Sequence, residues 1–166
     1  DGNQLWLARY NGPENSEDFP SAIAVDAAGN AHVTGTSVRP DLSAQQYATV
    51  KYDLDGNELW VTPYNGPRNH DAASAIALDA AGNVYVTGVS EGAGTSLDYA
   101  TLKYDPDGNQ LWVARYDDPD HGEDLAIAIV LDPAGNVFVT GGSCNGPPDP
   151  VKGCASSDFA TIKYAQ

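Results

Sequence analysis

The sequence predicts an all-β fold, and three observations support this prediction: short strand-like segments, turn residues between them, and an internal threefold repeat. Segments of about 5 or 6 residues are rich in Val, Ile, Thr, Tyr, Phe and Trp and are bounded by Gly, Asn, Asp and Pro. None of them has the sustained 3.6-residue periodicity of an amphipathic helix. The chain is therefore expected to consist of strands joined by tight turns.

The repeat divides the single domain, residues 1–166, into units over 1–54, 55–106 and 107–166. Each unit opens with DGNxLW and later reaches an apolar segment that ends in Asp, namely AIAVD, AIALD or AIVLD. A turn, AAGN or PAGN, then leads to AHVTG, VYVTG or VFVTG, and each unit closes with YATVKY, YATLKY or FATIKY. Because these matches cover nearly the whole chain, the fold must be built from repeated units.

Each unit is expected to hold four antiparallel strands in a meander. Asp-Gly and Gly-Asn favour the positive backbone angles of tight hairpin turns. Several segments are apolar at consecutive positions, as in Ala75 to Leu78, which is expected when a small sheet is covered on both faces. Four-stranded sheets repeated at this spacing predict β-propeller blades. A stacked solenoid is the less favoured alternative, because solenoid repeats are usually shorter.

The repeat also resembles a known family. The segments DAAGNVYVTG from Asp79 and DYATLKYDPDGNQLW from Asp98 are similar to the bacterial β-propeller repeat family SBBP, found in large secreted and cell-surface proteins. The resemblance spans all three units and implies the propeller fold. It implies no common activity or catalytic residues.

The two ends of the chain are expected to be complementary. If the strands of a blade are A to D from the centre outward, the chain reads D, ABCD, ABCD, ABC, with an isolated D strand over about Gln4–Tyr10 and a final C strand over about Phe159–Tyr164. An unpaired edge strand favours association with another chain. The residues predicted to form the joint are Leu5, Trp6, Leu7, Tyr10, Phe159, Thr161, Ile162 and Tyr164.

Three blades cannot close a ring, since propellers have about 4 to 8. We therefore expect the ends to be completed from outside, by a head-to-tail contact that gives a six-bladed dimer or a filament. The third possibility is continuation into further repeats of a longer chain. The sequence contains no Met and starts within a turn motif, which indicates a processed or excerpted segment.

Composition limits the classes of partner. The chain has 8 Lys and Arg against 23 Asp and Glu, a formal net charge of −15, so nucleic acid and anionic membrane surfaces are poor partners. No apolar run is long enough to span a bilayer as a helix. Other copies of the same chain are the expected partners, and glycans are a further candidate.

Cys144 and Cys154 lie in the longest loop between strands B and C, in SCNGPPDPVKGC. They are predicted to form a disulfide, because two cysteines without a histidine cluster make a poor zinc site. A disulfide is typical of oxidising, extracytoplasmic compartments. We therefore expect the protein to be secreted or displayed on the cell surface.

No catalytic, metal-binding or cofactor-binding motif is found. Asp18, Asp71 and Asp124 each precede the Asp that ends strand A by eight residues and are possible channel-face carboxylates. Capping of turn amides is the favoured interpretation of these residues, and cation binding is the alternative. The turns DLDGN and DPDGN resemble part of a calcium loop but lack its distal Glu. The three histidines occupy non-equivalent positions.

The sequence thus predicts a non-enzymatic, extracellular structural propeller segment that assembles head to tail. A ligand-binding or carbohydrate-binding surface propeller, of the adhesin or lectin kind, is the alternative. A propeller hydrolase or lyase is the weaker alternative, because two of the 23 acidic side chains meeting at a channel mouth would have no specific signature in the sequence.

Overall fold

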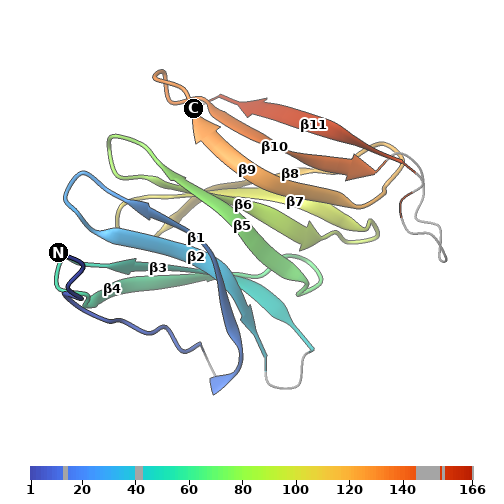
Figure 1. Ribbon diagram of the computed structural model, residues 1–166. Helices are drawn as coiled ribbons and strands as arrows, with labels where there is room; N and C mark the ends of the chain where they lie inside the picture. The colour runs from blue at the N-terminus through green and yellow to red at the C-terminus, as the bar shows by residue number, and fades with distance from the viewer. Residues whose placement is uncertain (13–14, 40–42, 145–153, 155, 166) are drawn as a thin grey trace.

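The computed structural model describes residues 1–12, 15–39, 43–144, 154 and 156–165, and over these residues the chain forms three antiparallel sheets. The three sheets stand side by side, with the N-terminus next to the first sheet and the C-terminus at the third (Figure 1). Two sheets have four strands and the third has three. The predicted open set of β-propeller blades is confirmed.

Eleven strands are present among the described residues, and each blade is a simple meander in which consecutive strands pair. Blade 1 comprises β1 (Asp18–Val25), β2 (Ala31–Val38), β3 (Gln45–Tyr52) and β4 (Glu58–Tyr64). Blade 2 comprises β5 (Asp71–Leu78), β6 (Val84–Glu91), β7 (Leu97–Tyr104) and β8 (Gln110–Tyr116). Blade 3 comprises β9 (Asp124–Leu131), β10 (Val137–Cys144) and β11 (Ser157–Tyr164).

The turns between strands are fixed by aspartate side chains. In the turn from β5 to β6, Asp79 accepts hydrogen bonds from the backbone amides of Ala81 and Asn83 and from the Asn83 side chain. Gly82 supplies the left-handed conformation, with φ of 84°, that the turn requires. Four other turns repeat these hydrogen bonds around Asp26, Asp53, Asp105 and Asp132. The carboxylates of the calcium-like motifs Asp53 and Asp105 are therefore occupied by their own turns.

The same hydrogen bonds lower the pKa of turn aspartates. The side-chain amide of Asn57 is the main cause of a lowered pKa at Asp53, and Asn109 has the same effect at Asp105. A hydrogen bond donated to a carboxylate stabilises its charged form, so these turns are best formed when the aspartates are ionised.

The hydrophobic core lies between the blades. Tyr47 of blade 1 is fully buried in a cluster with Val84, Val86, Leu102 and Tyr104, which lie on the facing side of blade 2. A second cluster between blades 2 and 3 is built in the same way around these residues: Tyr85, Tyr99, Ala126, Ile129, Val137 and Val139. Blade 2 is therefore covered on both faces, which explains why its strands are apolar at consecutive positions.

The outer strand of one blade also packs against the outer turn of the next blade. The indole nitrogen of Trp60 in β4 donates to the carbonyl oxygen of Pro106 at 3.1 Å. The Trp60 ring lies so close over Gly108 that a Cβ atom on this glycine would be 2.8 Å from it. Only glycine fits there, both because of the ring and because φ is 85°. This contact sets the position of blade 2 against blade 1.

The segment predicted as an isolated outer strand over Gln4–Tyr10 is not a strand in the structure. A strand needs a neighbour to share its backbone hydrogen bonds, and none of the described strands pairs with this segment. The predicted final strand, in contrast, is present as β11, and it pairs with β10 on one side only.

Removal of the turn carboxylate in Asp79→Ala is expected to lower the free energy of unfolding by about 2 kcal/mol, since three hydrogen bonds within the turn and one from the Tyr85 hydroxyl are lost. Urea denaturation at neutral pH measures this change. Asp107→Ala is the matched control, because this exposed side chain lies in a turn without capping it, and it should change stability by less than about 0.5 kcal/mol. Equal effects of the two substitutions would contradict the capping role.

Candidate assembly site

The two outer blades each leave one face open, and these faces form the candidate site. The open face of blade 1 is a hollow of about 270 Å³ whose strand residues include Ala31, Val33, Ala48, Val50 and Tyr52. These positions in blade 1 correspond to Val84, Val86, Ala100, Leu102 and Tyr104 in blade 2, all of which are buried against blade 1. Ala31, Ala48, Val50 and Tyr52 are already buried, at 3 to 7% exposed, so this face is only partly open although it is built like an internal blade interface.

The N-terminal segment lies on this open face. Its Trp6 packs against Tyr52 with ring centroids 6.4 Å apart, and the Trp6 ring lies over Gly56 so that a Cβ atom there would be 2.9 Å from it. This repeats the contact of Trp60 with Gly108, one blade earlier. Residues 4–10 therefore already occupy the place that the outer strand of a preceding blade would take.

Exposure separates the predicted N-terminal residues into two groups. Trp6 is 41% exposed and Tyr10 is partly buried, and both line the hollow. Burial is the main cause of a raised pKa at Tyr10, and a hydrogen bond with the Ser37 hydroxyl acts in the opposite direction. Leu5 and Leu7, at 91% and 68% exposed, point away from blade 1.

The open side of blade 3 is the counterpart. Phe159 in β11 is 93% exposed, whereas Tyr47 and Tyr99, at the same position in β3 and β7, are fully buried. In blades 1 and 2 each of these tyrosines packs at an angle against a tyrosine of the outer strand, Tyr64 or Tyr116, with centroids 5.3 Å apart. Phe159 lacks that partner because blade 3 has no outer strand among the described residues.

The other C-terminal residues differ in orientation. Thr161 is exposed, hydrogen-bonds with Thr140 at 2.9 Å, and lines a second hollow of about 200 Å³ together with Phe138 and Val130. Ile162 and Tyr164 instead pack inward against blade 2, where the Tyr164 ring is 6.1 Å from that of Trp112. Phe159 and Thr161 thus belong to the open side, while Ile162 and Tyr164 hold β11 in place.

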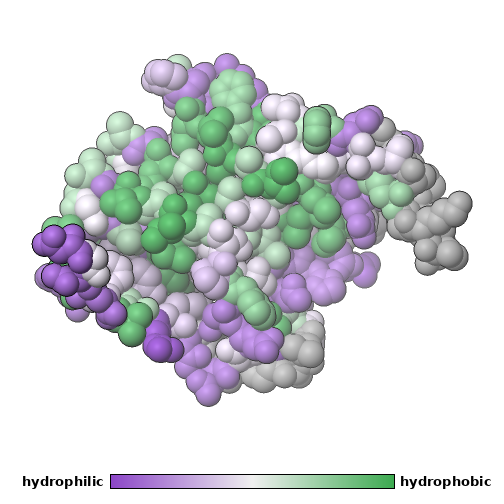
Figure 2. Space-filling model, viewed as in Figure 1, coloured by the Kyte–Doolittle hydropathy of each residue, from purple (hydrophilic) through white to green (hydrophobic). Residues whose placement is uncertain are grey.

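Apolar side chains are also exposed along the inner strands. Figure 2 shows apolar surface across the face where β5 and β9 lie in Figure 1. The largest exposed apolar side chains of β1 and β9 are Phe19, Ile23, Val25, Leu125, Ile127 and Val130. In a complete propeller the inner strands line the central channel, so this exposure fits an incomplete set of blades.

The three recurring carboxylates cap turns. Asp18, Asp71 and Asp124 accept a hydrogen bond from the backbone amide of Gly12, Gly66 and Asp118, at 2.8, 2.7 and 2.8 Å. Burial is the main cause of a raised pKa at Asp71 and Asp124, although Ser90 and Ser143 act in the opposite direction. Within the described ranges no group of three or more His, Cys, Asp or Glu side chains is placed to hold a metal ion.

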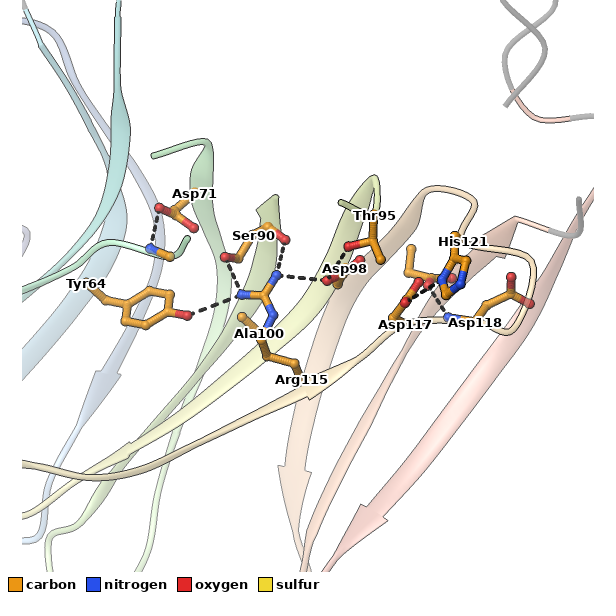
Figure 3. A network of polar contacts seen from close by, with 12 residues as sticks. Tyr64, Asp71, Ser90, Thr95, Asp98, Ala100, Arg115, Asp117, Asp118 and His121 are labelled. Carbon is orange, nitrogen blue, oxygen red and sulfur yellow. Dashed lines mark hydrogen bonds and ion pairs between the residues drawn. The ribbon is translucent and has the colours of Figure 1, made fainter. Parts of the chain in front are cut away.

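One polar cluster was not found by sequence reasoning. Arg115 in β8 donates to Asp98 Oδ2 at 2.9 Å and to the side-chain and backbone oxygens of Ser90, each at 2.6 Å (Figure 3). It also donates to the Tyr64 hydroxyl of blade 1 at 3.3 Å. The cluster ties the outer strand of blade 2 to its own sheet and to blade 1. In the sequence, the cluster is indicated only by the Arg in QLWVARY together with the Asp in DYATLKY.

The predicted disulfide is confirmed. Cys144, the last residue of β10, is bonded to Cys154 with an S–S distance of 2.07 Å, and the described residues include no free cysteine. The segment 145–153 between them lies outside the described residues. A disulfide indicates an oxidising environment. The part of the chain that the structure describes contains no helix long and apolar enough to cross a membrane.

The blades and their open ends define a protein made of β-propeller repeats. The comparison with protein families agrees: residues 59–94 match the family model SBBP, described as a beta-propeller repeat. These residues run from β4 of blade 1 through β5 and β6 of blade 2, and the three sheets are consistent with repeats of this kind. Residues 59–94 thus carry an SBBP beta-propeller repeat. No curated protein matches it.

Asp71→Asn is expected to change the pH dependence of stability. The folded-state pKa of Asp71 is raised, so its stabilising contribution is present below the unfolded-state pKa and is lost as pH rises through the folded-state pKa. Asparagine keeps an acceptor for the Gly66 amide but does not titrate. Relative to the wild type, the variant should therefore gain stability from pH 4 to pH 7 in urea denaturation. A difference that is constant over this range would contradict the raised pKa.

Reduction of the disulfide is expected to lower the free energy of unfolding by about 2 to 3 kcal/mol, because a cross-link over a sequence separation of 10 restricts the unfolded chain. Guanidinium denaturation with and without reductant measures the change. The double variant Cys144→Ala, Cys154→Ala should match the reduced wild type and should not respond to reductant. A reduced protein as stable as the oxidised one would contradict a stabilising role.

Proposed function

We propose that this chain is a non-enzymatic structural segment of an extracellular β-propeller, and that it assembles head to tail with other copies of itself. One observation carries the proposal: residues 4–10 already lie on blade 1 as the outer strand of a preceding blade would. Among the described residues blade 3 has no outer strand of the same sequence type. The occupant that we propose for the open side is a second copy.

The two open faces support this proposal by their complementarity. Docking of blade 3 from one copy onto blade 1 of the next would cover Phe138, Thr140 and Phe159 with the apolar hollow of blade 1. It would also place residues 4–10 beside the free edge of β11, where both segments would gain backbone hydrogen bonds. No rearrangement of blade 1 is needed, because the segment is already in position.

The register of the joint follows from the closed blades. In blade 2, Tyr99 pairs with Tyr116 and Lys103 with Trp112, and blade 1 has the same pairing. Transfer of this register to the joint pairs Phe159 with Tyr10 and Lys163 with Trp6 of the second copy. The angled aromatic pair found in blades 1 and 2 would then be present in blade 3 as well.

The contact is heterologous, so it produces either a closed ring or a filament. Two copies would supply six blades, which lies within the usual range of about 4 to 8. The disulfide supports an extracellular location, since it requires an oxidising compartment. These features support a structural role, because the proposed assembly would use backbone pairing and apolar faces.

Substitution of the most exposed aromatic residue tests the proposal. Phe159→Asp should weaken self-association of the wild-type chain by about 10-fold to 100-fold, because burial of Phe is worth about 1.5 to 3 kcal/mol. Sedimentation velocity over a range of concentrations measures the effect. Leu111→Asp is the matched control, since this residue is 53% exposed on β8 and lines neither hollow. It should leave association unchanged.

Deletion of residues 1–10 is the second test. The deletion should abolish association without unfolding the blades, because these residues belong to none of the described strands. Circular dichroism checks that the sheets remain. A wild-type chain that stays monomeric at all concentrations would overturn the proposal and would leave the open faces to another occupant, such as further repeats of a longer chain.

A further inference from the structure

We infer that the hollow of blade 1 is the binding site for the Phe159 ring of a second copy, and that the Ala48 carbonyl oxygen in this site can accept a hydrogen bond from a tyrosine hydroxyl, which Phe159 lacks. This inference rests on the proposed head-to-tail assembly and names the contact that specifies it. It follows from the two interfaces within the chain, where a tyrosine fills the equivalent site.

The interface between blades 1 and 2 shows how the site is filled. Tyr47 of β3 is fully buried, and its hydroxyl donates to the carbonyl oxygen of Ala100 in β7 at 3.3 Å. The hydroxyl oxygen lies so close to Gly88 that a Cβ atom on this glycine would be 2.8 Å from it. Gly88 also lies against the carbonyl oxygen of Ala72, so the sheet itself requires glycine here, and the missing side chain leaves room for the hydroxyl.

The interface between blades 2 and 3 repeats this arrangement. The hydroxyl of Tyr99 donates to the carbonyl oxygen of Ala160 at 3.3 Å and lies beside Gly141, where a Cβ atom would be 2.8 Å from it. Burial is the main cause of a raised pKa at both Tyr47 and Tyr99, and it raises the pKa of Tyr99 to about 12. Both hydroxyls therefore keep the proton that they donate.

Blade 1 has the same site on its partly open face. The buried cluster around Tyr47 takes these residues from blade 2: Ala73, Val84, Val86, Ala100, Leu102 and Tyr104. Their equivalents in the strand register of blade 1 all line the hollow: Pro20, Ala31, Val33, Ala48, Val50 and Tyr52. Gly35, the equivalent of Gly88, lines it as well. The hollow is thus the counterpart of the site that Tyr47 fills.

The carbonyl oxygens of these sites have the same partner within their own blades. Ala48 accepts a hydrogen bond from the Thr34 hydroxyl at 3.3 Å, and Ala100 accepts one from Thr87 at 3.3 Å. At Ala100 the hydroxyl of Tyr47 is an additional donor. Because a carbonyl oxygen can accept more than one hydrogen bond, the bond from Thr34 leaves Ala48 able to accept a second donor in the same way.

The hollow has room for one aromatic ring. Its volume is about 270 Å³, and an apolar cavity of about 150 Å³ is already large enough to bind benzene. Tyr10 lines the hollow and is the equivalent of Tyr64, which packs against Tyr47 with ring centroids 5.3 Å apart. A ring bound in the hollow would therefore have the same aromatic neighbour that Tyr47 has.

Phe159 is the occupant because it holds the position of Tyr47 and Tyr99 in blade 3. It opens the segment FATIKY, where the two tyrosines open YATVKY and YATLKY, and it is 93% exposed. Its ring suits the apolar walls of the hollow but donates no hydrogen bond to Ala48. The joint between copies would therefore lack one hydrogen bond that both interfaces within the chain have, and its affinity would be lower for that reason.

Addition of the missing hydroxyl tests the inference with the intact chain. Phe159→Tyr should tighten self-association about 3-fold to 10-fold in sedimentation velocity, because the new hydroxyl can donate to Ala48 across the joint. Phe138→Tyr is the matched control on the same side of blade 3. Its equivalent, Tyr85, directs its hydroxyl to Asp79 of its own blade, so this variant should change association by less than about twofold.

A small-molecule probe tests the site without the assembly. In the Phe159→Asp variant, which exposes the hollow of blade 1, p-cresol should bind at least about threefold more tightly than toluene, because only p-cresol carries the hydroxyl. An NMR titration measures both affinities. The shifted resonances should be those of residues that line the hollow, such as Val33 and Ala48.

The outcomes distinguish this inference from the proposal on which it rests. If the wild-type chain does not associate, the head-to-tail assembly is wrong and Phe159 is not the occupant. If the chain associates but Phe159→Tyr does not tighten association, or p-cresol binds no better than toluene, assembly stands and the role of the Ala48 carbonyl is wrong. Tighter association of Phe159→Tyr together with preferential binding of p-cresol supports both.

Discussion

The structure depends on one repeated contact, in which the outer strand of a blade places a tryptophan over the outer turn of the next blade. Trp60 covers Gly108 in this way, and Trp6 covers Gly56. Glycine is required at these positions for two reasons: the backbone is left-handed, and the tryptophan ring above leaves no room for a Cβ atom. In both places the outer turn of a blade is covered by a segment that precedes that blade in the chain, so the contact joins neighbouring units.

Repeat proteins gain stability from interfaces between neighbouring units as well as from the units themselves. Here blade 2 has both of its neighbours, and its facing strands are buried almost completely, while blade 3 leaves Phe159 and Thr161 exposed and blade 1 keeps a hollow whose strand residues are largely buried. In the proposed assembly these two faces would meet. An assembly of copies would repeat the packing found between the blades of one chain. The contact between chains would then be equivalent to the contact between blades.

Polar side chains give this repeated packing its specificity. Aspartates fix the turns by accepting amide hydrogen bonds, and the buried Asp71 and Asp124 cap the segments that lead into inner strands. The cluster of Arg115, Asp98 and Ser90 occurs in only one of the two closed blades. Apolar faces of similar shape fit one another in many ways, whereas such a cluster forms in a single register. The packing between blades thus combines a general apolar fit with a particular polar match.

The sequence by itself determined the blades, because turn residues, apolar segments and the repeat are local signals that tight turns and two-sided burial impose on each unit. It also determined the disulfide between Cys144 and Cys154 and the final strand β11. It did not predict that residues 4–10 lie on blade 1 without forming a strand, or that Arg115 joins Asp98, Ser90 and Tyr64. Only the tertiary structure decided these points, because they depend on how separate blades pack and on which strand edges remain unpaired.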